Sequence, residues 1–209
     1  MILLWGKRKE RINEKKIIFT VLLLVFTACT NNNYKKLVDE KFKKSEYDKI
    51  LVKKEAEKDY YKYDSKKKFW EEVVFLFIED NKKDGVKLYM GINYRGKDWL
   101  YMRSIEFIGD EGSLFNDFYD YRTFNPIWKD NTTLSRGVEE KILFPLKESY
   151  INELEYILEN KNLNITLRSD YDERLDKRKL SEKEVFKMKE ILNLYKKLQT
   201  KNEEKENGN

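Results

Sequence analysis

The stretch "VKLYMGINY" (residues 86–94) alternates two kinds of side chain with a period of two. One side of an extended chain here carries the apolar residues Val86, Leu88, Met90 and Ile92, and the other side carries Lys87, Tyr89, Gly91 and Asn93. Such alternation is typical of a half-buried strand in an antiparallel sheet. This stretch therefore predicts a domain built on a β-sheet.

The segments on either side of this strand continue the same pattern. "FWEEVVFLFIE" (69–79) and "WLYMRSIEFI" (99–108) are rich in aromatic and β-branched residues, which favours strands. The turns "NKKDG" (81–85), "RGKD" (95–98) and "GDEG" (109–112) separate and follow them, and Gly85 is free to adopt a positive φ. We expect three hairpin-linked strands that form a meander.

The second half of the chain adds helices. "KESYINELEYILENKN" (147–162) has apolar residues at helical spacing, and "SEKE" (181–184) is a capping box that begins a second amphipathic helix. "GVEEKILFPL" (137–146) and "LNITLRS" (163–169) are predicted strands. The sequence thus predicts an α+β domain over residues 69–199, an antiparallel meander or small sandwich of about five to seven strands with two helices in its C-terminal half. We expect residues 200–209 to be disordered.

Between these halves lies an aromatic, turn-rich segment, "SLFNDFYDYRTFNPIWKDN" (113–131). Phe118, Tyr121 and Trp128 are its candidate ligand-binding residues, because aromatic anchors dominate the energetics of binding surfaces. The alternative is that the cluster covers one end of the sheet. Composition alone leaves both interpretations open.

Two further groups of charged residues are candidates for a role. The acidic run Asp170, Asp172, Glu173 and Asp176 has oxygen ligands at the close spacing that calcium accepts, but it lacks the glycine and closing glutamate of an EF-hand loop. A strand edge blunted by charge is the alternative. For Arg168 we expect an ion pair with a carboxylate of the final helix. We predict no metal site and no cofactor.

The residue types that are missing exclude much chemistry. The chain of 209 residues has no histidine and one cysteine, so imidazole catalysis, histidine-containing zinc sites and internal disulfides are excluded. The formal net charge is +5, but residues 1–29 contain six basic and two acidic side chains and so hold most of the excess. Because a nucleic-acid-binding domain carries a clustered basic excess, we expect no nucleic-acid partner.

The amino-terminal segment has the order of a secretory signal. Lys15 and Lys16 precede the apolar run from Ile17 to Ala28, which is too short to span a bilayer because spanning takes about 20 residues. The sequence "FTAC" (26–29) that ends the run resembles the lipobox of bacterial lipoprotein signal peptides, although Phe26 stands where an aliphatic residue is usual. The resemblance implies cleavage after Ala28 and attachment of diacylglycerol to the thiol of Cys29. The alternatives are simple secretion or an uncleaved anchor.

The resemblance also sets the expected organisation of the chain. Residues 1–28 would be the signal peptide. The lysine-rich residues 29–68, whose apolar spacing is compatible with a helix, would be a tether that spaces the domain from the membrane. Residues 86–196 are similar to uncharacterised domains of exported bacterial lipoproteins. The features they share are Trp99, Phe107, Arg168, Leu180 and Tyr195. These domains have no established activity, so this second resemblance bears on architecture alone.

The function expected from these observations is that of a binding or scaffolding module. It would be held in the bacterial cell envelope by the lipid on Cys29, facing the periplasm or the exterior, with an envelope protein or polymer as partner. The alternative is a hydrolase that uses Asp or Glu carboxylates on a cell-wall or extracellular polymer. A pocket with converging carboxylates of raised pKa would favour the enzyme, and a shallow aromatic face would favour the binding module.

Overall fold

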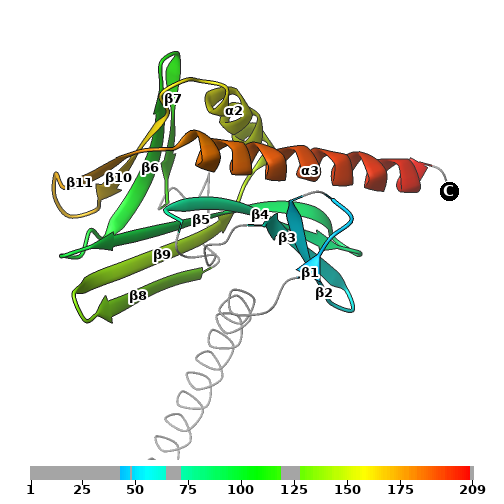
Figure 1. Ribbon diagram of the computed structural model, residues 1–209, viewed down its shortest axis with the longest axis horizontal. Helices are drawn as coiled ribbons and strands as arrows, with labels where there is room; N and C mark the ends of the chain where they lie inside the picture. Colours follow the sequence, from blue (N-terminus) through cyan, green and yellow to red (C-terminus); the bar gives the residue numbers. More distant parts are fainter. Residues whose placement is uncertain (1–42, 48, 65–71, 119–127, 208–209) are drawn as a thin grey trace, which may run out of the picture. The chain divides into compact units, whose positions relative to one another are not determined.

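Two antiparallel sheets and two helices make up the part of the chain that the computed structural model describes, residues 43–47, 49–64, 72–118 and 128–207 (Figure 1). The seven-stranded sheet has the strand order β1-β2-β3-β4-β5-β9-β8, and the four-stranded sheet has the order β11-β10-β6-β7. Helix α2 (Glu148–Leu158) follows β9, and helix α3 (Glu182–Asn207) follows β11. The predicted α+β class, the antiparallel pairing and the two helices of the C-terminal half are confirmed.

The strands are more numerous than predicted. Those of the larger sheet are β1 (Lys43–Lys44), β2 (Ile50–Lys54), β3 (Lys58–Tyr63), β4 (Val74–Asn81), β5 (Gly85–Gly96), β8 (Trp128–Leu134) and β9 (Gly137–Pro145). Those of the smaller sheet are β6 (Met102–Gly109), β7 (Gly112–Asp117), β10 (Asn164–Ser169) and β11 (Leu175–Lys179). The additional strands are short, charged, or both, so their apolar periodicity is weak.

The hairpin of β4 and β5 follows the sequence closely. Asn81 Oδ1 accepts a hydrogen bond from the backbone N–H of Lys83 at 2.9 Å, and its Nδ2 donates to Asp84 at 2.6 Å. Gly85 then has a φ of 79°, a left-handed conformation that costs glycine little. The turn predicted at residues 81–85 is therefore confirmed.

Strand β5 is buried on both faces, and the prediction of a half-buried strand is wrong. Its apolar side faces the main core, but on the opposite side Tyr89 is only 4% exposed. Its ring stacks on Phe77 of β4 with centroids 4.9 Å apart. Beside it, the ring of Phe75 lies over Gly91, where a Cβ would come within 2.0 Å of it. Aromatic side chains on the second face thus give the sheet a second apolar layer.

The folded domain begins earlier in the sequence than predicted. Residues 29–68 were expected to be a tether, but β2 and β3 lie within residues 50–63 and pair next to β4, near one edge of the large sheet. The inward residues Ile50 and Val52 are two positions apart, which is strand spacing, and Tyr61 lies beside Val52 in register. The abundant lysines made these strands hard to recognise in the sequence, because the aliphatic part of a lysine side chain can lie along a sheet while its ammonium group remains in water. Cys29 lies outside the described residues.

The predicted meander ends at its second strand. β5 pairs with β4 and β9, whereas β6 pairs with β7 and β10 in the other sheet. The chain therefore leaves one sheet and enters the other within residues 97–101. The prediction that residues 99–108 pair with the preceding strand is wrong, since alternation identifies a strand without naming its neighbour.

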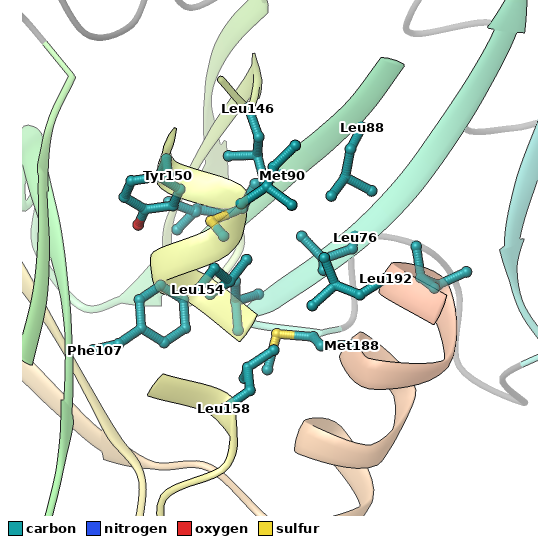
Figure 2. Packing of buried hydrophobic residues seen from close by; sticks show 14 of the residues in the cluster. Leu76, Leu88, Met90, Phe107, Leu146, Tyr150, Leu154, Leu158, Met188 and Leu192 are labelled. Atoms are coloured by element: carbon teal, nitrogen blue, oxygen red, sulfur yellow. The ribbon is translucent and has the colours of Figure 1, made fainter. Parts of the chain in front are cut away.

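A single apolar core joins the two sheets and both helices. Helix α3 packs against β3, β4 and β5, helix α2 packs against β6 and β7, and the helices contact each other (Figure 1). Figure 2 shows side chains from these elements that meet in this core, among them Leu76, Met90, Phe107, Leu154, Leu158 and Met188. Burying each such side chain stabilises the fold by about 1.5–3 kcal/mol.

Helix α3 begins as its sequence predicts. The Oγ of Ser181 accepts a hydrogen bond from the N–H of Glu184 at 3.3 Å, and Glu184 Oε2 accepts one from the N–H of Ser181 at 2.9 Å. This reciprocal pair is the predicted capping box. The helix continues to Asn207, so it includes most of the segment 200–209 that was expected to be disordered. Neither described helix has the length and apolarity needed to cross a membrane.

Candidate functional site

Of the three predicted ligand-binding residues, the structure describes the side chain of Phe118 alone. Phe118 is 2% exposed and belongs to the core, where its ring centroid lies 5.5 Å from that of Phe144. The burial of Phe118 therefore supports the alternative that the aromatic segment covers one end of the sheet. Tyr121 lies outside the described residues, and so does the side chain of Trp128.

A different set of aromatic residues comes together at the end of the smaller sheet. Trp99 and Tyr101 precede β6, and Tyr171 comes from the connection between β10 and β11. The ring centroids of Trp99 and Tyr101 are 6.4 Å apart, and those of Tyr101 and Tyr171 are 5.0 Å apart with planes at 88°. Tyr101 is 40% exposed and Tyr171 75%. We call these three residues the aromatic surface.

The backbone of Tyr101 is held in an unusual conformation. Its φ is 53°, a left-handed value that is rare for a bulky residue and marks local strain. The carboxylate of Glu140 on β9 accepts backbone hydrogen bonds from Leu100 at 2.5 Å, Tyr101 at 2.8 Å and Met102 at 2.8 Å. Glu140 is 0% exposed. Because three consecutive N–H groups converge on one buried carboxylate, the chain must bend there, and the ring of Tyr101 remains at the surface.

The loop that carries Tyr171 is braced by its own polar groups. The Oγ of Ser169 accepts the N–H of Tyr171 at 3.2 Å, and the N–H of Ser169 donates to the carbonyl of Arg174 at 3.1 Å. The N–H of Asp170 donates to the carbonyl of Tyr101 at 3.0 Å. The two segments of the aromatic surface are therefore tied together through the backbone.

Two arginines border the aromatic surface. Arg174 donates from Nη1 to the carbonyl of Trp99 at 2.7 Å and from Nε to Asp172 at 2.5 Å. Arg103 pairs with Asp117 at 3.1 Å and with Asp170 at 3.2 Å. The hydrogen bonds that Arg103 donates to the Asp117 carboxylate are the main cause that raises the pKa of the Arg103 guanidinium. We call these five charged residues the rim.

The predicted partners of the charged groups are partly corrected. Arg168 Nη2 pairs with Glu106 on the neighbouring strand β6 at 2.6 Å, so the expected partner on the final helix is wrong. In the acidic run, Asp170, Asp172 and Asp176 each form an ion pair with an arginine. Within the described ranges, no three His, Cys, Asp or Glu residues are grouped so that they could hold a metal ion.

Two cavities lie away from the aromatic surface. A groove of about 720 Å³ runs between the end of α2, the start of β10 and the start of α3, and its lining includes Asn160, Lys179 and Phe186. A smaller one of about 440 Å³ lies between α2 and β7 and is lined in part by Tyr156. None of the residues that line them belongs to the aromatic surface or its rim.

The carboxylates with a resolved pKa shift do not have the protonation expected of a general acid. For Glu139, burial would raise the pKa, but hydrogen bonds and charge from Lys141 and Arg95 lower it below the usual value. For Asp172 burial acts in the same direction, and hydrogen bonds from Arg174 and Ser169 again lower the pKa. Both groups are therefore held as anions, which suits ion pairing more than proton donation.

The aromatic surface was not predicted from the sequence, because two of its residues belong to a predicted strand and the third to a polar segment between predicted elements. Trp99 and Tyr101 lie in "WLYM", at alternate positions of a predicted strand, and Tyr171 lies in the polar segment "SDYDERL". The available signal was a tryptophan and a tyrosine two positions apart directly after the turn at 95–98. No protein-family model, curated protein or solved structure matches the chain. Its function has therefore to be inferred from its own residues.

Proposed function

We propose that the chain is a lipid-anchored protein of the bacterial cell envelope whose folded domain binds an envelope component through the aromatic surface. The observation that carries the binding part is the exposure of Tyr101 and Tyr171, at 40% and 75%, next to Trp99. Exposed aromatic rings that gather at one place are uncommon on a surface that binds nothing. Rings held in fixed positions bind at low cost in conformational entropy.

The bracing of these rings supports binding over a purely structural role. The left-handed φ of Tyr101 costs free energy, and the buried carboxylate of Glu140 compensates by accepting three N–H groups. Packing of the core does not require a tyrosine ring in solvent. A costly backbone conformation that keeps a ring exposed is therefore better explained by a partner that contacts the ring.

The anchoring part of the proposal rests on the sequence of residues 15–29. A basic stretch, a short apolar run and "FTAC" together favour acylation of Cys29. Diacylglycerol attached to the thiol supplies two acyl chains, and two chains anchor a protein stably whereas one binds a membrane only marginally. More than ten residues lie between Cys29 and Lys43, where β1 begins, and these residues remain available as the tether.

Each part of the proposal has its own test. For anchoring, cells that express the wild type or Cys29→Ala are labelled with an alkyne fatty acid, and only the wild type should incorporate it. Equal labelling of both chains would contradict the lipid anchor.

For binding, the full chain purified in detergent is sedimented with an insoluble envelope preparation. We expect Tyr171→Ala to lower the bound fraction markedly. The matched control is Tyr156→Ala, which removes another exposed tyrosine (61% exposed) from helix α2. Equal binding by wild type and Tyr171→Ala would show that the aromatic surface is not the binding site.

A further inference from the structure

We infer that the ligand of the aromatic surface is a neutral glycan chain, an inference that rests on the proposed function. A sugar ring presents apolar C–H groups on its faces and hydroxyl groups around its edge. The aromatic surface offers the matching arrangement, with exposed rings in the middle and hydrogen-bonding charged groups at the rim. The negative face of an aromatic ring attracts the polarised C–H groups of a sugar.

The charge of the rim argues against an anionic polymer. Each rim arginine is already bound by carboxylates, Arg174 by Asp172 at 2.5 Å and Arg103 by Asp117 and Asp170 at 3.1 and 3.2 Å. Two guanidinium groups thus face three carboxylates. A phosphate or uronate group would have to displace these carboxylates to gain a bidentate contact, and it would meet their repulsion. A neutral ligand meets neither obstacle.

The rim still has hydrogen-bonding capacity for hydroxyl groups. The side chains of Arg103, Arg174 and Asp172 are 48%, 45% and 42% exposed. A guanidinium has five N–H donors and a carboxylate has about four lone-pair sites, and the ion pairs use only part of them. The exposed N–H donors and carboxylate oxygens can therefore accept hydrogen bonds from sugar hydroxyl groups and donate hydrogen bonds to them.

The size of the surface argues against a folded protein as partner. A tyrosine or tryptophan side chain buries at most about 150–250 Å², and these three are only partly exposed. Together they supply less than the roughly 800 Å² that each partner contributes to a standard protein–protein interface. A chain of sugar rings can instead contact the rings of Tyr101 and Tyr171, 5.0 Å apart, and extend over an open surface.

The test measures binding of defined probes to the full chain in detergent by isothermal titration calorimetry. The probes are neutral hexasaccharides of N-acetylglucosamine, glucose or mannose, and polyphosphate as the anionic probe. We expect at least one hexasaccharide to bind, with an affinity that changes less than about twofold between roughly 0.05 and 0.5 M salt. Tyr171→Ala should weaken that binding about tenfold, and Tyr156→Ala should leave it unchanged.

The variant Asp172→Asn separates the two ligand classes. It removes the carboxylate that holds the guanidinium of Arg174, so an anionic ligand would bind more tightly to it. A neutral glycan should bind Asp172→Asn no more tightly than the wild type. Binding of polyphosphate alone, strengthened in Asp172→Asn, would overturn the glycan inference.

The glycan inference and the proposed function can fail separately. If no hexasaccharide binds while the envelope preparation still binds in a Tyr171-dependent manner, the ligand class is wrong and the proposed function stands. If envelope binding is the same in wild type and Tyr171→Ala, the proposed function is wrong and the glycan inference fails with it. Absence of binding to every probe and to the envelope preparation would overturn both.

Discussion

Two regions of the molecule each bury a polar side chain but differ in how they satisfy its hydrogen bonds. One is the connection between β5 and β6, which contacts Glu140 of β9, and the other is the inner face of β7, which carries Asn116. At the connection, Glu140 is 0% exposed and accepts hydrogen bonds from three consecutive backbone N–H groups. On β7, Asn116 is 2% exposed, and neither atom of its amide has a hydrogen-bond partner in the described part of the chain.

The difference shows that two buried polar side chains of one core can affect the fold in opposite ways. Glu140 determines where the chain changes sheets, because the N–H groups of residues 100–102 have no strand partner at that point and need an acceptor. Asn116 lies opposite Ile105 on β6, among apolar neighbours, and its amide loses its hydration with no compensating bond. We therefore expect the first group to stabilise the fold and the second to destabilise it.

Glu140→Leu should have the largest effect on stability. The substitution introduces an apolar side chain of similar size and leaves three N–H groups without an acceptor, two of them on the buried residues Leu100 and Met102. At about 1–3 kcal/mol for each unsatisfied group, the two buried N–H groups alone should lower the free energy of unfolding by about 2–6 kcal/mol. Urea denaturation followed by circular dichroism measures this change.

Glu140→Gln serves as the milder variant if Glu140→Leu does not fold. It retains one acceptor oxygen and should lose about half as much stability, since its amide nitrogen cannot accept a hydrogen bond. A loss below about 1 kcal/mol in both variants would mean that the connection does not depend on this carboxylate.

Lys187→Met should have the next largest effect and places a third kind of buried polar group in the comparison. Lys187 of α3 forms an ion pair with Glu72, and the two side chains are 8% and 10% exposed. Removing the lysine takes the ion pair with Lys187 away from the buried Glu72 carboxylate, and the loss of such a pair costs about 3 kcal/mol in comparable cases. The measurement is again the free energy of unfolding in urea.

The double variant Glu72→Leu with Lys187→Met is the control for this pair. Replacing both charges by apolar groups should recover most of the loss, because neither charge of the pair is then buried without the other. A double variant as unstable as Lys187→Met would show that packing at these positions, and not the loss of the ion pair, determines the effect.

These buried polar groups mark the limit of what the sequence could predict. The hairpin at Gly85, the capping box at Ser181 and the two helices were predictable, because each depends on residues within a few positions of one another. The departure of β6 was not, because the acceptor for the N–H of Leu100 is Glu140, 40 positions away. A glutamate in "GVEEKILFPL" has no feature that separates it from a surface acid.

The same limit applies to the candidate site. The candidate binding aromatics predicted from the sequence were Phe118, Tyr121 and Trp128, and of these the structure describes only the side chain of Phe118, which lies in the core. Tyr171 lies next to Tyr101 only because β10 pairs with β6. Local periodicity does not predict which distant strands pair. The strands at 50–63 were missed for a related reason, since lysine-rich segments have little apolar periodicity whether they pair or not.

Asn116→Leu should raise stability, which makes it the opposite of Glu140→Leu. Leucine has nearly the shape of asparagine and restores apolar contacts beside Ile105, so the free energy of unfolding should increase by about 1 kcal/mol. Thermal unfolding of Asn116→Leu and wild type under the same conditions measures it. A loss of stability would show that the amide forms an interaction that offsets its burial, and Asn116→Ala, which leaves a cavity, should lose stability in either case.

Glu139→Gln should give the smallest effect and one that depends on pH. Glu139 adjoins Glu140 in sequence, but its carboxylate binds side chains, Arg95 at 2.6 Å and also Lys141. Burial would raise its pKa, yet these partners lower it. A pKa that is lower in the folded state contributes stability above the unfolded value of about 4.3, and this contribution is lost as the pH falls through the folded pKa.

The stability difference between wild type and Glu139→Gln should therefore be present at neutral pH and shrink as the medium becomes acidic. Because the side chain of Arg95 is 49% exposed, salt should screen part of the effect. Urea denaturation at a series of pH values, at low and high salt, measures both dependences. A difference that stays constant down to the lowest pH would mean that the charge of Glu139 contributes nothing, and that the hydrogen bonds of its side chain account for the difference.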